Sequence, residues 1–236
     1  MCSSLLNPSA TEPPLPSVRD RPIVCYVTDG QESPSTSREH FLSERIRTAL
    51  TAGADWIQIR EKNICSRSLV GLVRQSVRDA STIASASRIL VNDRLDVALA
   101  ADASGVHLGR ESFPAEPTVY WCRAGAAPKG FLVGVSCHSL EEVRAAESGG
   151  VDYVFFGPIF DTPSKRLFGT PQGTNRLSDV CRFARVPVIA IGGVDETNAS
   201  DCIRAGAKGI AAIRSFQNRS DAASIQNFVS AIHACG

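Results

Sequence analysis

Short apolar runs alternate with longer segments of helical periodicity along most of this chain, and this alternation is the strongest constraint on its fold. The runs are rich in Val, Ile, Phe and Ala with little polar alternation, which is typical of strands buried on both faces of a parallel sheet. Eight such runs occur, at Ile23–Thr28, Asp55–Arg60, Arg88–Asn92, Gly105–Leu108, Phe131–Ser136, Tyr153–Gly157, Val188–Ile191 and Gly209–Ile213. They predict eight parallel strands joined by helical crossovers.

The segments between the runs carry apolar residues at helical spacing, as in Glu39–Ala52, Ser66–Ala80, Leu95–Ala101, Leu140–Ser148 and Glu196–Ala205. Several of them end in a small-residue turn that leads directly into a strand, as in AGADWIQI at 52–59 and AGAKGIAAI at 205–213. A glycine in such a turn can take the left-handed conformation that ends a helix. We therefore expect a single (β/α)8 TIM barrel of the α/β class, with an open doubly wound sheet as the alternative.

Length and composition agree with one globular domain. The chain has 236 residues, 43% of them hydrophobic and 21% charged, and a net charge of +1. The near-zero charge argues against nucleic acid as a partner, and no apolar run approaches the roughly 18 residues of a membrane span. The Ser- and Pro-rich residues 1–20 lack the features of a signal peptide, so we expect a flexible N-terminal extension followed by a barrel domain over 21–236.

Eight cysteines are the unusual count in this composition. The chain is too long and too aliphatic for a small disulfide-stapled domain, and it contains no C-x-x-C pair that would indicate zinc or thiol redox chemistry. Several cysteines lie inside apolar runs, where a free thiol packs as a small hydrophobic group. We expect reduced, buried cysteines in a cytoplasmic protein.

Polar residues gather where the predicted strands end, which is where barrels of this type carry their chemistry. The second strand leads into Arg60 and Lys62, and Lys165 follows the sixth. These cations predict a site for a large anion such as a diphosphate. Gly192-Gly193 and Ile213–Ser215 follow the last two strands, where many barrels bind a phosphate, although the glycines could instead form a tight turn.

Two further residues leave alternatives open. Asp93 would suit Mg²⁺, which takes one or two carboxylates together with phosphate oxygens, but spacing alone favours a charge at the start of a helix. His138 follows the fifth strand and would suit a general base near neutral pH, although a histidine there could instead be structural or solvated. His107 is ambiguous, and His40 and His233 lie on predicted helices and look inert. No nucleophile elbow accompanies Ser136, Cys137 and His138.

Taken in order, these residues resemble the superfamily of thiamine phosphate synthases and thiazole tautomerases over about residues 23–216. The motifs that carry the resemblance are QIREK (58–62), VNDRLDVALA (91–100), GVHLG (105–109), VGVSCHSLEEV (133–143), GVDYVFFGPIFDTPSK (150–165) and PVIAIGGV (187–194). The resemblance implies a (β/α)8 fold. It also implies a transferase of thiamine biosynthesis that joins a pyrimidine diphosphate to a thiazole phosphate and releases diphosphate.

The resemblance also assigns residues. Those implied to be catalytic are Arg60, Lys62, Ser136, His138 and Lys165. Those implied to bind substrate are Gln58, Ile59, Glu61, Asn92, Thr162, Pro163, Ser164, Gly193, Ile213 and Arg214, and Asp93 would bind Mg²⁺. The partners are then small phosphorylated pyrimidine and thiazole molecules, without nucleic acid or membrane, and the oligomeric state stays open.

One departure from the synthase pattern bears on the metal. Ser112 stands where the family usually has a second Mg²⁺-binding Asp, and a hydroxyl is a much poorer ligand than a carboxylate. Arg214 also replaces a small residue and could add a phosphate contact. The departure at Ser112 favours the sister activity, a metal-free thiazole tautomerase with His138 as acid and base, whereas the retained QIREK and TPSK motifs favour the synthase. A non-catalytic thiazole-phosphate binding protein is the third interpretation.

Overall fold

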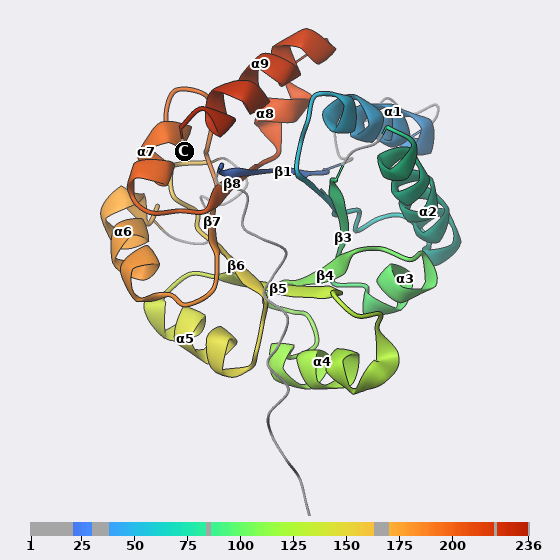
Figure 1. The fold of residues 1–236 in the computed structure, drawn as a ribbon, viewed down its shortest axis with the longest axis horizontal. Helices are drawn as coiled ribbons and strands as arrows, with labels where there is room; N and C mark the ends of the chain where they lie inside the picture. The colour runs from blue at the N-terminus through green and yellow to red at the C-terminus, as the bar shows by residue number, and fades with distance from the viewer. Residues whose placement is uncertain (1–20, 30–37, 84–85, 163–169, 220, 236) are drawn as a thin grey trace, which may run out of the picture.

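The computed structural model describes residues 21–29, 38–83, 86–162, 170–219 and 221–235. Within them, eight parallel strands close into a barrel in chain order, and helices surround it on the outside (Figure 1). The strands are β1 (Ile23–Val27), β2 (Trp56–Ile59), β3 (Arg88–Asn92), β4 (Gly105–Leu108), β5 (Leu132–Cys137), β6 (Tyr153–Phe156), β7 (Val188–Ile191) and β8 (Gly209–Ala212). Pairing of β1 with β8 closes the sheet, which confirms the (β/α)8 barrel and excludes the open sheet.

The helices of the outer ring follow the strands in alternation (Figure 1). They are α1 (Arg38–Thr51), α2 (Ser66–Thr82), α3 (Leu95–Ala100), α4 (Ala115–Trp121), α5 (Leu140–Ser148), α6 (Gly173–Phe183), α7 (Ala199–Arg204), α8 (Arg214–Gln217) and α9 (Ala222–His233), and one π-helical turn, η2 (Cys122–Ala126), continues α4. Each predicted strand matches an observed one to within one residue at either end.

The helix expected over Glu196–Ala205 is shorter than predicted, because polar side chains hold the preceding turn. The Asp195 carboxylate accepts hydrogen bonds from the Thr197 amide and hydroxyl, at 2.9 and 2.6 Å. The Asn198 side chain accepts from the Asp195 amide at 2.9 Å. Such Asx-type bonds compete with helix formation, and α7 accordingly begins only at Ala199.

Two hydrophobic clusters divide the core according to the alternation of side chains along each strand. The smaller one fills the barrel and includes Cys25, Leu90, Tyr153, Phe155 and Ile189. The larger one lies between the strands and the surrounding helices and takes the intervening positions, such as Ile57, Ile59 and Val91. Interior and exterior positions alternate along barrel strands. We call the interior positions of each strand its inner series. The residues that continue this series toward the carboxyl end of a strand face the mouth of the barrel.

At the opposite end, Asp55 ties the amino-terminal ends of the strands together. Its carboxylate accepts from Arg21 and from the Val24 amide, at 2.9 and 3.0 Å, and contacts His233 at 2.7 Å. Burial raises the pKa of Asp55, but these donors outweigh it and hold the pKa below its ordinary value. His233, which the sequence left without a role, therefore anchors α9 to the base of the barrel.

The seven cysteines among the described residues are all free thiols, as expected. The expectation that they are buried holds for Cys25, Cys122, Cys137 and Cys202, whereas Cys181 is half-buried and Cys65 and Cys235 are exposed. No helix in the described part of the chain is long and apolar enough to cross a membrane.

Candidate active site

Polar side chains from β2 and β3 meet at the carboxyl end of the barrel. Gln58 and Asn92 continue the inner series of their strands, and the Gln58 amide donates to Asn92 Oδ1 at 2.9 Å. Gln58 is only 2% exposed, and its Oε1 has no hydrogen-bond partner in the part of the chain that the structure describes. Buried polar atoms are normally paired, so this oxygen is suited to accept a hydrogen bond from a ligand.

A second polar group comes from β4, β5 and β6. His107 is fully buried, with Nε2 2.9 Å from Ser136 Oγ and Nδ1 3.1 Å from the Tyr153 hydroxyl. Burial lowers the pKa of His107 to about 3, against a smaller opposite effect of the Asp93 charge. The imidazole is therefore neutral at physiological pH, and Ser136, the half-buried member, is the one nearest the barrel mouth.

Hydrogen bonds that involve Thr28 and Glu61 hold the turn after β2 in place. The Arg60 amide donates to Thr28 Oγ1 at 2.9 Å, and the Thr28 hydroxyl donates to the buried Glu61 carboxylate at 2.7 Å. Arg38 pairs with the same carboxylate at 3.2 Å. Glu61, expected to bind substrate, is thus held by protein groups, and its bonds shape the turn that carries Arg60 and Lys62.

The expected substrate contact of Ile59 stays a prediction, which the backbone rather than the side chain of this residue would fulfil. Its side chain is 1% exposed and belongs to the cluster between the strands and the helices. The pleat places it on the outer face of the sheet, so only its backbone faces the site. Arg60 and Lys62 are half-buried and exposed, respectively, and neither side chain forms a hydrogen bond or ion pair with another described residue.

Asp93 lies in the turn after β3 with a left-handed backbone, φ 61°. Its Oδ1 accepts from the Ser112 hydroxyl and from the Gly109 amide at 3.1 Å, and its Oδ2 accepts from the Asn92 amide at 2.6 Å. Both carboxylate oxygens therefore face hydrogen-bond donors. The described residues contain no cluster of three or more His, Cys, Asp and Glu side chains suited to a metal.

This donor set fits Mg²⁺ only in a limited way. Asp93 is exposed and supplies one carboxylate, while the Ser112 hydroxyl stands where the resemblance implies a second carboxylate. Mg²⁺ commonly keeps several waters and binds one or two carboxylates together with substrate phosphates. One carboxylate is thus sufficient for an ion that phosphate oxygens help to hold, but not for a site formed by protein alone.

The loops after β6, β7 and β8 meet at the other side of the barrel mouth. Gly193 has φ 69°, and a β-carbon there would lie 2.7 Å from the Asp161 carbonyl oxygen, so the close approach of the two loops requires glycine. Arg214 donates to the Thr162 hydroxyl at 2.9 Å, which joins the loop after β6 to the start of α8. Pro163, Ser164 and Lys165 lie outside the described residues.

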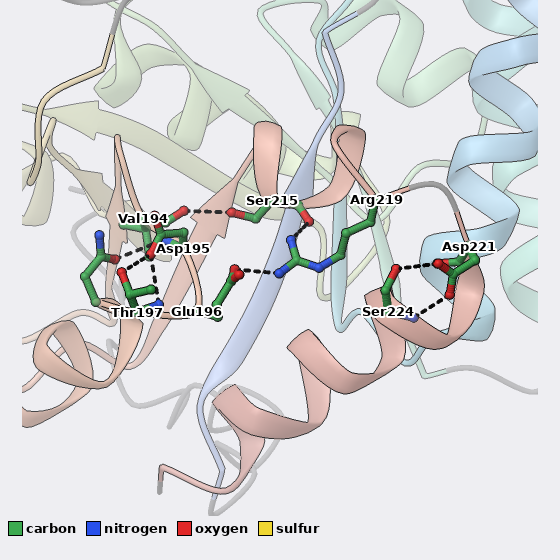
Figure 2. A network of polar contacts seen from close by, with 9 residues as sticks. Val194, Asp195, Glu196, Thr197, Ser215, Arg219, Asp221 and Ser224 are labelled. Atoms are coloured by element: carbon green, nitrogen blue, oxygen red, sulfur yellow. Dashed lines mark hydrogen bonds and ion pairs between the residues drawn. The ribbon is translucent and has the colours of Figure 1, made fainter.

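Polar contacts brace the two loops that follow β7 and β8. Figure 2 shows Ser215 and Arg219, from the segment after β8, reaching Val194 and Glu196 after β7. The Ser215 hydroxyl donates to the Val194 carbonyl at 2.9 Å, and Arg219 pairs with Glu196 at 2.5 Å and donates to the Ser215 carbonyl. These contacts fix the backbone around Gly193 and Ile213, where a phosphate was expected.

His138 follows β5 and is half-buried, with Nδ1 against the Gly157 carbonyl oxygen. A carbonyl oxygen accepts hydrogen bonds only, so Nδ1 is the donor in this contact. Its amide donates to the Glu142 side chain. The ring is thus oriented by backbone, in keeping with a group placed at the end of a strand.

Sequence reasoning missed the coupling of His107 to Ser136 and Tyr153, and the structural roles of Thr28 and Arg38. A usable signal existed for the first. His107, Ser136 and Tyr153 all occupy positions of the inner series on adjacent strands, which the strand register would have brought together.

The chain is similar to a known protein family over most of its length. The family model described as thiamine monophosphate synthase matches residues 24–216. A thiamine-phosphate synthase of Roseiflexus sp. (strain RS-1) is 38% identical over 210 residues, covering 85% of this chain and 84% of that protein. One of Moorella thermoacetica is 40% identical over 183 residues, covering 76% and 82%. The solved structure of a thiamine phosphate pyrophosphorylase from Pyrococcus furiosus aligns with a TM-score of 0.76 at 29% identity, covering 90% and 96%.

Proposed function

Because the chain belongs to the thiamine monophosphate synthase family, we propose that it makes thiamine phosphate as a step of thiamine biosynthesis. The reaction couples 4-amino-2-methyl-5-(diphosphooxymethyl)pyrimidine to a thiazole phosphate. The bond between the methylene carbon and the diphosphate oxygen breaks, and a bond from that carbon to the thiazole nitrogen forms. The observation that carries the proposal is the family match, which extends from β1 to α8.

Arg60 and Lys62 would bind the diphosphate. Their side chains have no partner among the described residues and stand on a turn that Thr28 and Glu61 hold in place. Negative charge develops on the diphosphate as it leaves, so fixed cations beside it stabilise the transition state more than the ground state. Lys165, outside the described residues, would add a third cation.

Asp93 would hold Mg²⁺, and that ion would supply further positive charge against the leaving diphosphate. Gln58 and Asn92 would bind the pyrimidine end of the same substrate, for which the buried, unpaired Oε1 of Gln58 offers an acceptor. Ser136 would lie beside the pyrimidine ring. Each of these side chains comes from the inner series of β2, β3 or β5, or from the turn directly after β3.

The thiazole phosphate would bind on the opposite side of the mouth. Gly193 and the backbone of Ile213 would supply amide donors, and Arg214 would add charge, oriented by its bond to the Thr162 hydroxyl. Oriented backbone amides beside a glycine suit a phosphate group. The bracing of the loops after β7 and β8 supports this assignment, because a preorganised site loses less entropy on binding.

We further infer that residues 21–236 form one catalytic domain, with residues 1–20 as an extension, and that the protein works in the cytoplasm. The barrel elements from Ile23 to His233 support the first inference, and the free thiols of the seven cysteines among the described residues support the second.

The proposal is tested by supplying both phosphorylated substrates with Mg²⁺ and measuring thiamine phosphate. We expect the native protein to form this product, and we expect Arg60→Ala or Lys62→Ala to lower the rate of its formation by at least about tenfold. No product at any Mg²⁺ concentration would overturn the synthase. If the protein forms no thiamine phosphate but converts one tautomer of a carboxythiazole phosphate into the other, and if this conversion requires His138, the protein is a tautomerase instead.

A further inference from the structure

His107, Gly134 and Tyr153 form one row across three neighbouring strands. Gly134 pairs with His107 on β4 and with Tyr153 on β6. A β-carbon at Gly134 would lie 2.0 Å from the Tyr153 ring, so the glycine leaves the space that the ring occupies. The phenol thereby passes over β5 and reaches His107 Nδ1 at 3.1 Å.

The positions of the protons in this row follow from its burial. His107 is neutral, so one of its two ring nitrogens carries a proton and the other accepts. The Tyr153 hydroxyl is also neutral, since burial raises its pKa well above the ordinary value. Among the described residues its hydrogen-bond partner is His107 Nδ1.

A buried hydroxyl whose proton meets no acceptor is destabilising. If Nδ1 carried the imidazole proton, Tyr153 would accept it and its own proton would face apolar surroundings. Donation from Tyr153 to Nδ1 satisfies both groups and leaves the proton of His107 on Nε2. Nε2 lies 2.9 Å from Ser136 Oγ, which then accepts a hydrogen bond from the ring.

We propose that His107 is a positioning residue, held in the Nε2–H tautomer by Tyr153, which makes Ser136 accept from the imidazole and donate its own hydroxyl proton to the substrate. The proposal rests on the proposed function for the identity of that substrate. An aminopyrimidine offers ring nitrogens as acceptors and an exocyclic amino group as a donor. A Ser136 hydroxyl that donates to the substrate selects a ring nitrogen. With the opposite tautomer of His107, Ser136 would donate to the imidazole and accept from the amino group of the substrate.

The tautomer is read directly by ¹⁵N NMR of the full-length protein with labelled imidazole, because a protonated ring nitrogen and an accepting one resonate far apart. The His107→Gln variant assigns the signals. We expect His107 protonated on Nε2 in the native protein, and a mixture of tautomers in Tyr153→Phe. A native protein protonated on Nδ1 would overturn the proposal, whether or not the protein is a synthase.

Kinetics supply the second measurement. Ser136→Ala and His107→Leu should each lower kcat/KM for the pyrimidine diphosphate about ten- to a hundredfold, and the double variant should lose no more than either. His107→Gln, whose amide can still donate to Ser136, should recover most of that loss. If the losses in kcat/KM add up in the double variant, or if His107→Gln recovers none of the loss, then His107 does not act through Ser136.

Phe155→Leu is the matched control for packing. The Phe155 ring lies 4.2 Å from the His107 ring between centroids but forms no hydrogen bond with it. Thermal unfolding of each variant identifies those that fail to fold. A loss in Phe155→Leu as large as in His107→Leu would assign the effect to packing and overturn the proposal. If the native protein does not join the pyrimidine to the thiazole phosphate, that result would count against the proposed function alone.

Discussion

The Ser112 hydroxyl donates a hydrogen bond to Asp93 Oδ1, across the turns that follow β4 and β3. A neutral donor thus lies against the carboxylate proposed to hold Mg²⁺, at the position where the resemblance leads one to expect a second carboxylate. A divalent cation at Asp93 would replace this hydrogen bond with a metal bond. Its affinity would then depend on the phosphate oxygens of the substrate more than on protein ligands.

Ser112→Asp is expected to raise the affinity for Mg²⁺ in the substrate-free protein by at least about tenfold, because it supplies a second hard oxygen anion. Without metal, two carboxylates in contact repel each other, so the variant should also melt at a lower temperature than the native protein until Mg²⁺ is added. Calorimetric titration and thermal unfolding with and without Mg²⁺ measure both effects. Ser112→Asn, similar in size but neutral, should show neither, and equal behaviour of the two variants would count against Asp93 as a metal ligand.

His107 predicts a dependence of stability on pH. The unfolded chain takes up a proton at this histidine below about pH 6.5, whereas the folded protein does so only near the lowered pKa of about 3. The free energy of unfolding should therefore fall as the pH drops through this window, by on the order of 2 kcal/mol at pH 5 from this group. Denaturant unfolding of the native protein and of His107→Gln isolates the contribution; a slope that survives in the variant would show that other groups cause it.

Gly193→Ala should destabilise the protein by about 1–3 kcal/mol and weaken binding of the thiazole phosphate, since its left-handed backbone and the nearby Asp161 carbonyl leave no room for a methyl group. Gly71→Ala is the matched control. Gly71 lies in the middle of α2 with open space around it, so alanine there should stabilise the protein by about 0.5–1 kcal/mol. Denaturant unfolding and calorimetric binding are the measurements. Comparable stability of the two variants would contradict the requirement for glycine.

Arg219→Ala should loosen the loops after β7 and β8. Arg219 is mostly buried, pairs with Glu196 and the Ser215 carbonyl, and lies 4.8 Å from the centre of the Phe228 ring. We expect a loss of about 1–3 kcal/mol in stability and a raised KM for the thiazole phosphate. Arg204→Ala removes an exposed pair with Asp201 and should change stability by less than about 1 kcal/mol. An unchanged KM in Arg219→Ala would remove the proposed link between this bracing and phosphate binding.

The strands were predictable because strands buried on both faces are largely apolar, as Val188–Ile191 is, and because eight such runs alternate with segments of helical periodicity. The carboxyl-end position of Gln58, Asn92 and Ser136 follows from the same rhythm. Helix starts were harder to predict, because side-chain bonds such as those of Asp195 decide them locally.

Several contacts between residues distant in sequence could not be predicted from the sequence. The Glu61 carboxylate is held by Thr28 and Arg38, which are distant from it in sequence. The pleat of β2, which the QIREK motif does not reveal, places the Ile59 side chain on the outer face of the sheet. His107 was ambiguous because its contacts depend on Gly134, whose missing side chain lets Tyr153 reach across a strand. Register and packing, rather than composition, determine these relationships.

The central claim is tested most directly by following one reaction of the native protein by ³¹P NMR, with both phosphorylated substrates and Mg²⁺ present. We predict that diphosphate and thiamine phosphate appear in equal amounts as the pyrimidine diphosphate and the thiazole phosphate disappear. Diphosphate released without thiamine phosphate, or no change in either substrate, would contradict a coupling enzyme.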